Sequence, residues 1–125
     1  MEIFYLHTSS STLAKHCILN IHCSILFPVA PTSIITAQLM FVVGTDGGGL
    51  EHPNWKQNLK VAVKIQEKAN EMYPGLFRDM NLSKSRYNQH VSNGAFIIEV
   101  GTTGNTLEEA KNSMKYLANV IESFK

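Results

Sequence analysis

The sequence predicts an α/β fold in which a mainly parallel sheet is flanked by helices. Three observations carry this prediction. A continuous apolar run, residues 39–43, has the character of a strand that is buried on both faces. Two later segments, which begin near Pro53 and near Thr106, repeat apolar residues at helical spacing. The resulting order of strand, helix, strand, loop, strand and helix is typical of α/β domains.

The first predicted helix begins near Pro53, a residue that the first turn of a helix tolerates. Its apolar residues recur every three or four positions, so they form one buried face, and Pro74-Gly75 ends the helix. The residues of this face are Trp55, Leu59, Ala62, Ile65, Ala69 and Met72.

The second predicted helix begins at Thr106, which forms a capping box with Glu109, so that each side chain satisfies a free amide of the first turn. Its apolar face repeats at the same spacing and consists of Leu107, Ala110, Met114, Leu117, Ile121 and Phe124. Between the two helices, residues 76–82 and 95–100 are predicted strands, and residues 83–94 are a polar loop.

The composition excludes several classes of protein. The chain has 125 residues, enough for one domain with a buried core. Its 11 basic and 10 acidic residues give a net charge of +1, which disfavours a nucleic-acid binder. The longest apolar stretch, residues 18–43, is interrupted by polar residues and prolines, whereas a membrane span needs about 20 mostly apolar residues. No signal peptide is recognisable, so we expect a cytoplasmic location for the chain as written.

Residues 1–36 differ in composition from residues 37–125. The first segment has two charged residues, whereas the second has ten basic and nine acidic ones. The first segment also holds both cysteines and three of the five histidines, at a spacing that matches no structural zinc pattern. Within it, residues 3–6 and 18–21 have the character of short strands. We therefore divide the chain into an atypical segment, 1–36, and an α/β domain, 37–125.

Glu99 stands out because it interrupts an otherwise apolar strand near the C-terminal end of that strand. In open α/β sheets, ligands bind outside the carboxyl ends of the strands. Burial of a carboxyl group in apolar surroundings favours its protonated form, which suits a general acid or base near neutral pH. The other interpretation is that Glu99 faces water or pairs with a Lys or Arg. The residues alone leave both interpretations open.

The polar loop offers a charge, an aromatic ring and two amides in succession, from Arg86, Tyr87, Asn88 and Gln89. Such a set suits binding of a peptide or a sugar, and the alternative is an ordinary surface loop. His90 follows as a potential metal ligand or proton carrier, or as a solvated histidine. The glycine-rich residues 45–49 follow a strand but lack the ending of a phosphate loop, so we interpret them as a flexible connection.

Six phrases occur in a fixed order from about Gln38 to the end of the chain. They are residues 41–46 (FVVGTD), 53–59 (PNWKQNL), 73–76 (YPGL), 86–89 (RYNQ), 97–101 (IIEVG) and 105–110 (NTLEEA). In these phrases the chain resembles the C-terminal part of the stage II sporulation protein P family, over roughly the last seven tenths of its length.

The resemblance implies a function. The family consists of zinc-dependent N-acetylmuramoyl-L-alanine amidases with an α/β domain, which cleave the amide between the lactyl group of the glycan and the stem peptide. They act during forespore engulfment, outside the mother-cell membrane at the septum, beside stage II sporulation protein D. The resemblance implies a catalytic glutamate at Glu99 and a zinc ion held upstream by two histidines and a glutamate. With such a substrate, we expect the residues of the polar loop that suit peptide binding, Arg86, Tyr87, Asn88 and Gln89, to contact the stem peptide.

The family's metal-binding motifs precede residues 41–46 and so fall in the atypical segment. There, His7 and His22 echo the family's first and last zinc histidines, although they stand closer together than the family's motifs do, and His22 is the candidate metal ligand. We therefore predict an amidase-like domain that is truncated at its N-terminal side. The alternative is a catalytically inactive α/β remnant that binds cell-wall peptide or a partner protein.

Overall fold

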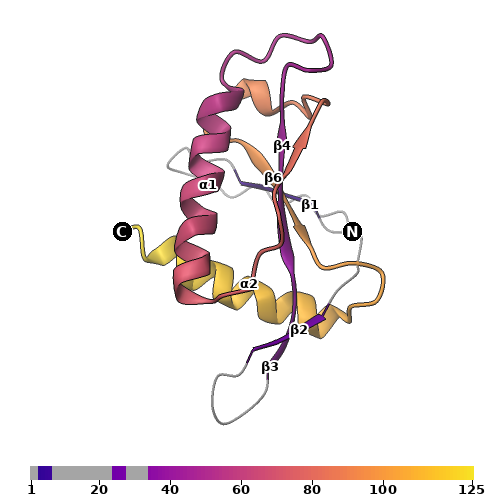
Figure 1. Cartoon of the computed structure of the whole chain (residues 1–125), viewed down its shortest axis with the longest axis vertical. Helices are drawn as coiled ribbons and strands as arrows, with labels where there is room; N and C mark the ends of the chain where they lie inside the picture. The colour runs from indigo at the N-terminus through magenta and orange to yellow at the C-terminus, as the bar shows by residue number, and fades with distance from the viewer. Residues whose placement is uncertain (1–2, 7–23, 28–33) are drawn as a thin grey trace.

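The computed structural model describes residues 3–6, 24–27 and 34–125. The central element is a four-stranded sheet with the order β1-β6-β4-β5, and β2 and β3 form a separate two-stranded ladder (Figure 1). The strands are β1 (Ile3–Leu6), β2 (Ser24–Phe27), β3 (Ile34–Ala37), β4 (Leu39–Gly44), β5 (Asn81–Ser83) and β6 (Phe96–Val100). The helices are α1 (Trp55–Met72) and α2 (Leu107–Glu122), with a short 3-10 turn, η1 (Gln89–Val91).

The α/β class is confirmed, but the prediction of a mainly parallel sheet is wrong. Only β4 and β5 pair in parallel, whereas β6 runs antiparallel to both β4 and β1. The reason lies in the connection between β5 and β6. It contains no helix to carry the chain back along the sheet, so β6 begins at the edge where β4 and β5 end and must run in the opposite direction.

The hydrophobic core lies between one face of this sheet and the two helices. Alternate residues of β4 and β6 point to this face, because successive side chains of a strand alternate between faces. The strands supply Leu39, Phe41, Val43, Phe96, Ile98 and Val100, and the helices supply Ala62, Ile65, Ala69, Ala110, Leu117 and Val120. Phe41 is at the centre, stacked on Phe77 at 4.6 Å and in edge contact with Phe96 at 5.0 Å between ring centroids.

Both predicted helices are confirmed. In α2, the Glu109 amide donates to Thr106 Oγ1 at 3.2 Å, and the Thr106 amide donates to Glu109 Oε2 at 2.8 Å, so the capping box is complete. Two residues of the predicted apolar face do not join the core, because Leu107 is 55% exposed and Phe124 is 53% exposed. Both stand at the ends of the predicted face, since Leu107 is the first residue of α2 and Phe124 lies beyond its last residue, Glu122.

The strand predicted over residues 76–82 is shorter and later than expected, since β5 covers Asn81–Ser83 and only an isolated bridge joins Phe77 to Leu39. The strand predicted over residues 3–6 is present as β1 and pairs with β6, so the atypical segment contributes to the same sheet. The strand predicted over residues 18–21 lies outside the described residues. Truncation of the domain stays a prediction.

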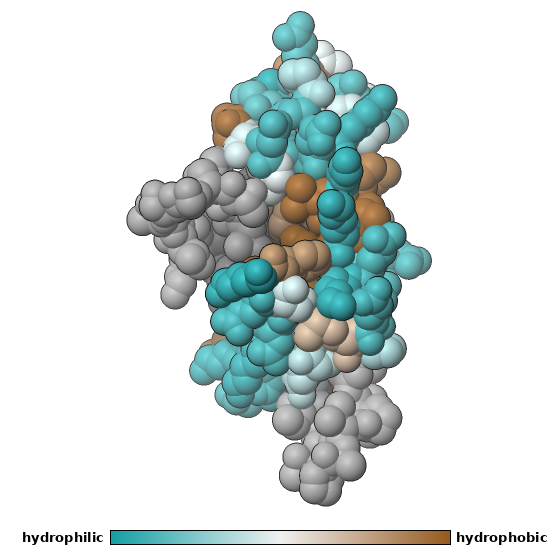
Figure 2. All heavy atoms as spheres, turned by 90° about the vertical axis from the view of Figure 1, so that its left-hand side faces the viewer, coloured by the Kyte–Doolittle hydropathy of each residue, from teal (hydrophilic) through white to brown (hydrophobic). Residues whose placement is uncertain are grey.

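The surface on the side of α1 is mostly hydrophilic, with a hydrophobic area near its middle (Figure 2). A shallow apolar hollow of about 230 Å³ lies between the two helices and is lined by Val61, Lys64, Ile65, Ile121 and Phe124. Within the described part of the chain, no helix is long and apolar enough to cross a membrane.

Candidate functional site

Glu99 lies on β6, opposite Met40 of β4 in the ladder. Its neighbours Ile98 and Val100 belong to the core, so Glu99 points to the face of the sheet that is turned away from α1 and α2. Its Oε2 accepts a hydrogen bond from Arg78 Nη2 at 3.2 Å, and the exposed fractions of the two side chains are 20% and 33%. Glu99 therefore pairs with an arginine.

Arg78 is held in place by its own backbone. Its amide donates to the Leu39 carbonyl at 2.9 Å, and its carbonyl accepts from Gln66 Nε2 at 3.3 Å. Its Nε is buried without a hydrogen-bond partner among the described residues. The backbone of Arg78 is thus tied to β4 on one side and to α1 on the other, and its guanidinium contacts Glu99.

A second polar cluster lies at the other end of the sheet, where β4 and β5 end and the two loops 45–53 and 84–95 meet (Figure 1). Gln89 is fully buried here. Its Oε1 accepts from the Gly44 amide at 2.8 Å, and its Nε2 donates to the Val42 carbonyl at 3.1 Å. Because both ends of its amide are bonded to β4, Gln89 holds the loop to the sheet.

Asn58 of α1 extends this buried network. Its Oδ1 accepts from the Gly94 amide at 2.7 Å and from the Ala95 amide at 3.2 Å. Its Nδ2 donates to the Gln89 carbonyl at 3.0 Å and lies 3.3 Å from His52 Nε2. One side chain therefore ties the first turns of α1 to the start of β6 and to the polar loop.

Arg86, Tyr87 and Asn88 form the outer part of the same loop. Tyr87 and Asn88 have positive φ values of 51° and 60°, a left-handed conformation that costs free energy for residues other than glycine. Arg86 Nη1 donates to the Glu51 carbonyl at 3.0 Å, and Tyr87 Oη accepts from Ser83 Oγ at 3.1 Å. The first bond joins the left-handed turn to the loop that follows β4, and the second joins it to the end of β5.

Two of the glycines in residues 44–49, Gly44 and Gly48, lie where the polar loop leaves no room for a side chain. A Cβ at Gly44 would lie 2.5 Å from the Ser85 carbonyl oxygen, and a Cβ at Gly48 would lie 2.5 Å from that of Lys84. The Thr45 amide also donates to the Ser83 carbonyl at 2.8 Å. Gly44 and Gly48 are therefore positions where the polar loop approaches the backbone closely, and the interpretation of residues 45–49 as a flexible connection stays a prediction.

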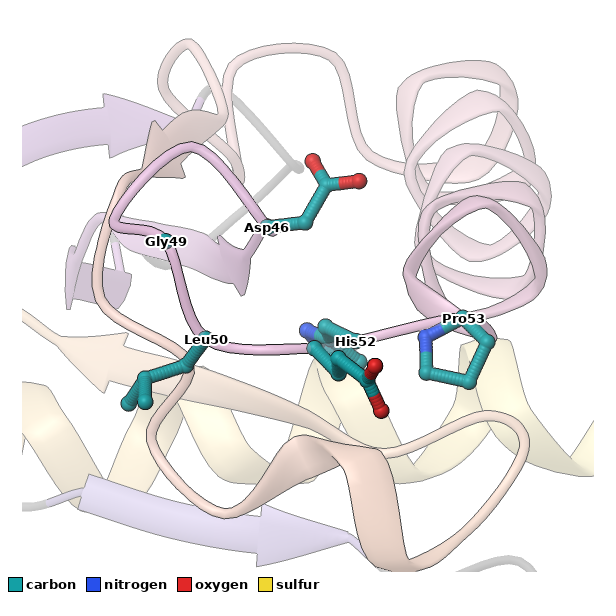
Figure 3. Close-up of a pocket in the computed structure, with 6 residues that line it drawn as sticks. Asp46, Gly49, Leu50, His52 and Pro53 are labelled. Atoms are coloured by element: carbon teal, nitrogen blue, oxygen red, sulfur yellow. The ribbon is translucent and has the colours of Figure 1, made fainter.

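Two pockets that share Leu50 lie at this end of the sheet. The first has a volume of about 520 Å³ and is lined by Asp46, Gly49, Leu50, Glu51, His52 and Pro53. The second has a volume of about 340 Å³ and is lined by residues of the same loop and by residues 84–88. Figure 3 shows Asp46 on one arm of the first loop and His52 on the other, with Leu50 between them along the chain.

His52 is the functional candidate that the sequence analysis missed. The side chain is 1% exposed and lines the first pocket, and its Nδ1 has no hydrogen-bond partner among the described residues. Burial lowers the pKa of His52 below its ordinary value of 6.5, the charges of His90 and Arg86 lower it further, and the Gln89 carbonyl and Asp46 oppose the change. Its position directly before Pro53 gave no periodic signal that could have marked it as buried.

The predicted catalytic and binding residues lie at opposite ends of the sheet. Glu99 is opposite Met40, whereas Arg86 and Gln89 contact β4 near Gly44, four residues further along the strand. Because a strand rises about 3.3 Å per residue, four residues correspond to a separation of about 13 Å along the sheet. The structure therefore brings Arg86, Tyr87, Asn88 and Gln89 together and keeps Glu99 apart from them.

A metal centre was expected from the resemblance. In residues 3–6, 24–27 and 34–125, no three His, Cys, Asp or Glu side chains gather in a way that could hold a metal ion. The rings of His52 and His90 are in edge contact at 6.5 Å between centroids, without a third such side chain. The candidate ligand His22 lies outside the described residues.

The model of the stage II sporulation protein P family matches residues 35–122. The chain belongs to this family. The match begins within β3, ends with α2 and includes the strand that carries Glu99, the polar loop and both pockets. Membership in the stage II sporulation protein P family places the chain among sporulation proteins and confirms the predicted resemblance. No curated protein and no solved structure matches the chain.

Proposed function

We propose that the chain is a peptidoglycan hydrolase of the sporulation type, an N-acetylmuramoyl-L-alanine amidase that cleaves the amide between the lactyl group and the stem peptide. The observation that carries the proposal is the family match over residues 35–122, which includes Glu99 within the phrase 97–101. The enzyme acts on the septal cell wall during engulfment, beside the glycan-cleaving stage II sporulation protein D.

In this proposal, Glu99 is the general acid and base. Its carboxylate takes a proton from the attacking water and delivers it to the nitrogen of the leaving stem peptide, so the C–N bond breaks as an amine leaves. Two features support this role. The carboxylate is partly shielded on the sheet, and Arg78 binds only Oε2, which leaves Oε1 without a partner among the described residues.

The family's zinc ion would polarise the scissile carbonyl and activate the water when bound. The described residues do not fit such an ion, because they contain no group of three suitable side chains. We therefore derive no step through zinc, and we assign its binding to residues outside the described ranges, with His22 as the candidate ligand. About one zinc per chain, lost in His22→Ala, would support this assignment. Zinc content that is unchanged by His22→Ala would overturn it.

The polar loop is proposed to bind the stem peptide through Arg86, Tyr87 and Asn88. The separation of about 13 Å from Glu99 suits a polymeric substrate, since an extended peptide spans about 3.3 Å per residue. Gln89 holds the loop to the sheet, because the oxygen and the nitrogen of its side-chain amide are both hydrogen-bonded to β4.

The experiment measures the rate at which new amino groups of L-alanine appear in purified peptidoglycan treated with the zinc-loaded chain. The proposal expects turnover by the wild type and a loss of at least 100-fold in Glu99→Gln, the contribution typical of acid–base catalysis. Glu71→Gln is the matched control, because Glu71 is an exposed carboxylate paired with Lys68 on α1. Equal rates for Glu99→Gln and the control would overturn the role of Glu99.

One observation favours the alternative, a chain that binds the wall without cleaving it. The ion pair with Arg78 gives Glu99 a structural partner, as expected for a carboxylate that only stabilises the sheet. Sedimentation with insoluble peptidoglycan separates the two functions. Binding that is retained in Glu99→Gln, together with no amine release by the wild type, would establish the alternative.

A further inference from the structure

Two dipeptides of the sequence place a glycine directly after a side chain that its backbone nitrogen can attack, Asp46-Gly47 and Asn93-Gly94. When the glycine nitrogen bonds to the carbonyl carbon of that side chain, a five-membered succinimide ring closes. Glycine favours the closure, because it has no Cβ and adopts backbone conformations that other residues avoid. In an unfolded chain asparagine reacts faster than aspartate, since a carboxylate is a poor electrophile at neutral pH. The sequence alone therefore points to Asn93 as the reactive residue.

The fold protects the Asn93-Gly94 dipeptide. Gly94 is buried, and its amide donates to Asn58 Oδ1 at 2.7 Å. Asn58 is itself fully buried, and the same oxygen accepts from the Ala95 amide at 3.2 Å. The Gly94 nitrogen has to lose its proton and turn toward Asn93 before the ring can close. The buried hydrogen bond to Asn58 must therefore open first, which makes the reaction slow in the folded chain.

The Asp46-Gly47 dipeptide lacks this protection. Both residues are exposed, and among the described residues the Gly47 amide bonds only to Thr45 Oγ1, in an exposed contact of 3.2 Å. None of the ion pairs in the described ranges involves the Asp46 carboxylate. A Cβ built at Gly47 would meet side-chain atoms and no backbone, so the segment around Gly47 has room to move. The glycine nitrogen and the carboxyl group are thus both accessible for ring closure.

We propose that Asp46-Gly47 is a site of spontaneous modification, at which folded chains convert Asp46 to isoaspartate while Asn58 keeps Asn93 intact. The Gly47 nitrogen bonds to the Asp46 side-chain carbon, and the carboxylic acid loses its hydroxyl group, which leaves as water with the amide proton. Hydrolysis then adds one water back and opens the ring, with the backbone passing through the former side chain. Because Asp46 lines the first pocket and its carbonyl accepts from the Gly49 amide, the product changes the wall of that pocket.

The test compares the folded chain with the same chain unfolded in guanidinium chloride, each kept for several weeks at one temperature and neutral pH. Isoaspartate is measured by enzymatic methyl labelling, and both dipeptides are followed by peptide mass spectrometry. In the folded chain we expect the product at Asp46 to exceed that at Asn93 by about tenfold or more, because a buried hydrogen bond protects Asn93. In the unfolded chain the order should reverse. Asp79, which is exposed and precedes a methionine, is the internal control and should stay unmodified.

Two variants test the roles of the individual groups. Gly47→Ala should slow the modification of Asp46 about tenfold or more, because a Cβ hinders the attacking nitrogen, and the variant should fold since a Cβ there meets only side-chain atoms. Asn58→Ala should raise the product at Asn93, and the unfolded wild type gives the same comparison where this variant does not fold. A folded wild type that modifies Asn93 as fast as Asp46, or that leaves Asp46 intact, would overturn the proposal. An unchanged rate at Asp46 in Gly47→Ala would also overturn it.

Discussion

Arg78 Nη2 lies 3.2 Å from Glu99 Oε2, on the face of the sheet that is turned away from both helices. The two residues are 21 positions apart. Glu99 is opposite Met40 in the β4–β6 ladder, and the Arg78 amide donates to the Leu39 carbonyl. Glu99 is consequently held beside Arg78 within the segment that the family model matches, residues 35–122. The pair therefore serves either to orient a catalytic carboxylate or simply to stabilise the sheet.

Substitution of Arg78 distinguishes these roles. Arg78→Gln should lower the free energy of unfolding by about 1 kcal/mol or less, because partly exposed ion pairs contribute little. If Arg78 positions a catalytic group, Arg78→Gln should lower kcat about tenfold or more with little change in KM. Arg78→Lys should then have a higher kcat than Arg78→Gln. Urea unfolding and the amine-release assay give the two values. A variant with unchanged kcat would leave the pair a purely structural role.

Replacement of Gln89 should destabilise the fold strongly. Gln89→Ala removes the acceptor of the Gly44 amide and the donor to the Val42 carbonyl, both in a buried position. Two unsatisfied buried groups cost about 2–4 kcal/mol together. Urea unfolding measures this loss, with Gln57→Ala on the exposed surface of α1 as a control that should change stability by about 0.5 kcal/mol or less. A similarly small effect of Gln89→Ala would contradict the supporting role given to Gln89.

The glycines after β4 should differ in their tolerance of alanine. A Cβ at Gly44 meets the backbone oxygens of Ser85 and Arg86 at 2.5 and 2.8 Å, so Gly44→Ala should cost about 2 kcal/mol or more. A Cβ at Gly47 meets only side-chain atoms, the nearest being Thr45 Oγ1 at 3.2 Å, so Gly47→Ala should cost less than about 1 kcal/mol. The melting temperatures of the two variants measure this difference. Equal decreases in melting temperature would show that the two loops are not packed as described.

The stability of the chain should depend on pH through His52. Burial lowers the pKa of His52 in the folded chain below the ordinary value of 6.5 that it has when unfolded. The unfolded chain therefore binds the extra proton first as the pH falls, so the stabilisation is complete above about pH 6.5 and is lost as the pH falls below that value. The difference in unfolding free energy between the wild type and His52→Gln should thus shrink from pH 7.5 to pH 5.5. A constant difference would mean that His52 does not titrate as a buried group.

The sequence alone was sufficient to predict the positions of the helices and of the strands that have a clear hydrophobic pattern. Apolar residues at helical spacing and the capping box of Thr106 and Glu109 are local signals, and α1, α2, β4 and β6 lie where those signals predicted them. The direction of β6 was not predictable in this way. A strand buried on both faces has the same pattern in a parallel and an antiparallel ladder, so the direction depends on the connection 84–95 and on the pairing with β1.

The candidate site shows the same division between local and long-range information. The sequence singled out Glu99, because a charge inside an apolar strand is a local anomaly, but it could not identify Arg78 as the partner from 21 residues away. Gln89 was predicted to bind substrate because it stands in a polar loop, yet its amide is bonded to β4, over a separation of more than 40 residues. His52 and Asn58 were missed because polar residues become recognisable as buried only when the loops are folded together.

The identity of the reaction products is the most direct test of the proposed activity. The zinc-loaded full chain is incubated with purified peptidoglycan, and the soluble material is identified by mass spectrometry. The account predicts stem peptides with a free N-terminal L-alanine, glycan strands that keep their lactyl groups, and no such products from Glu99→Gln. The absence of stem peptides from the wild-type reaction, or their release in equal yield by Glu99→Gln, would contradict it.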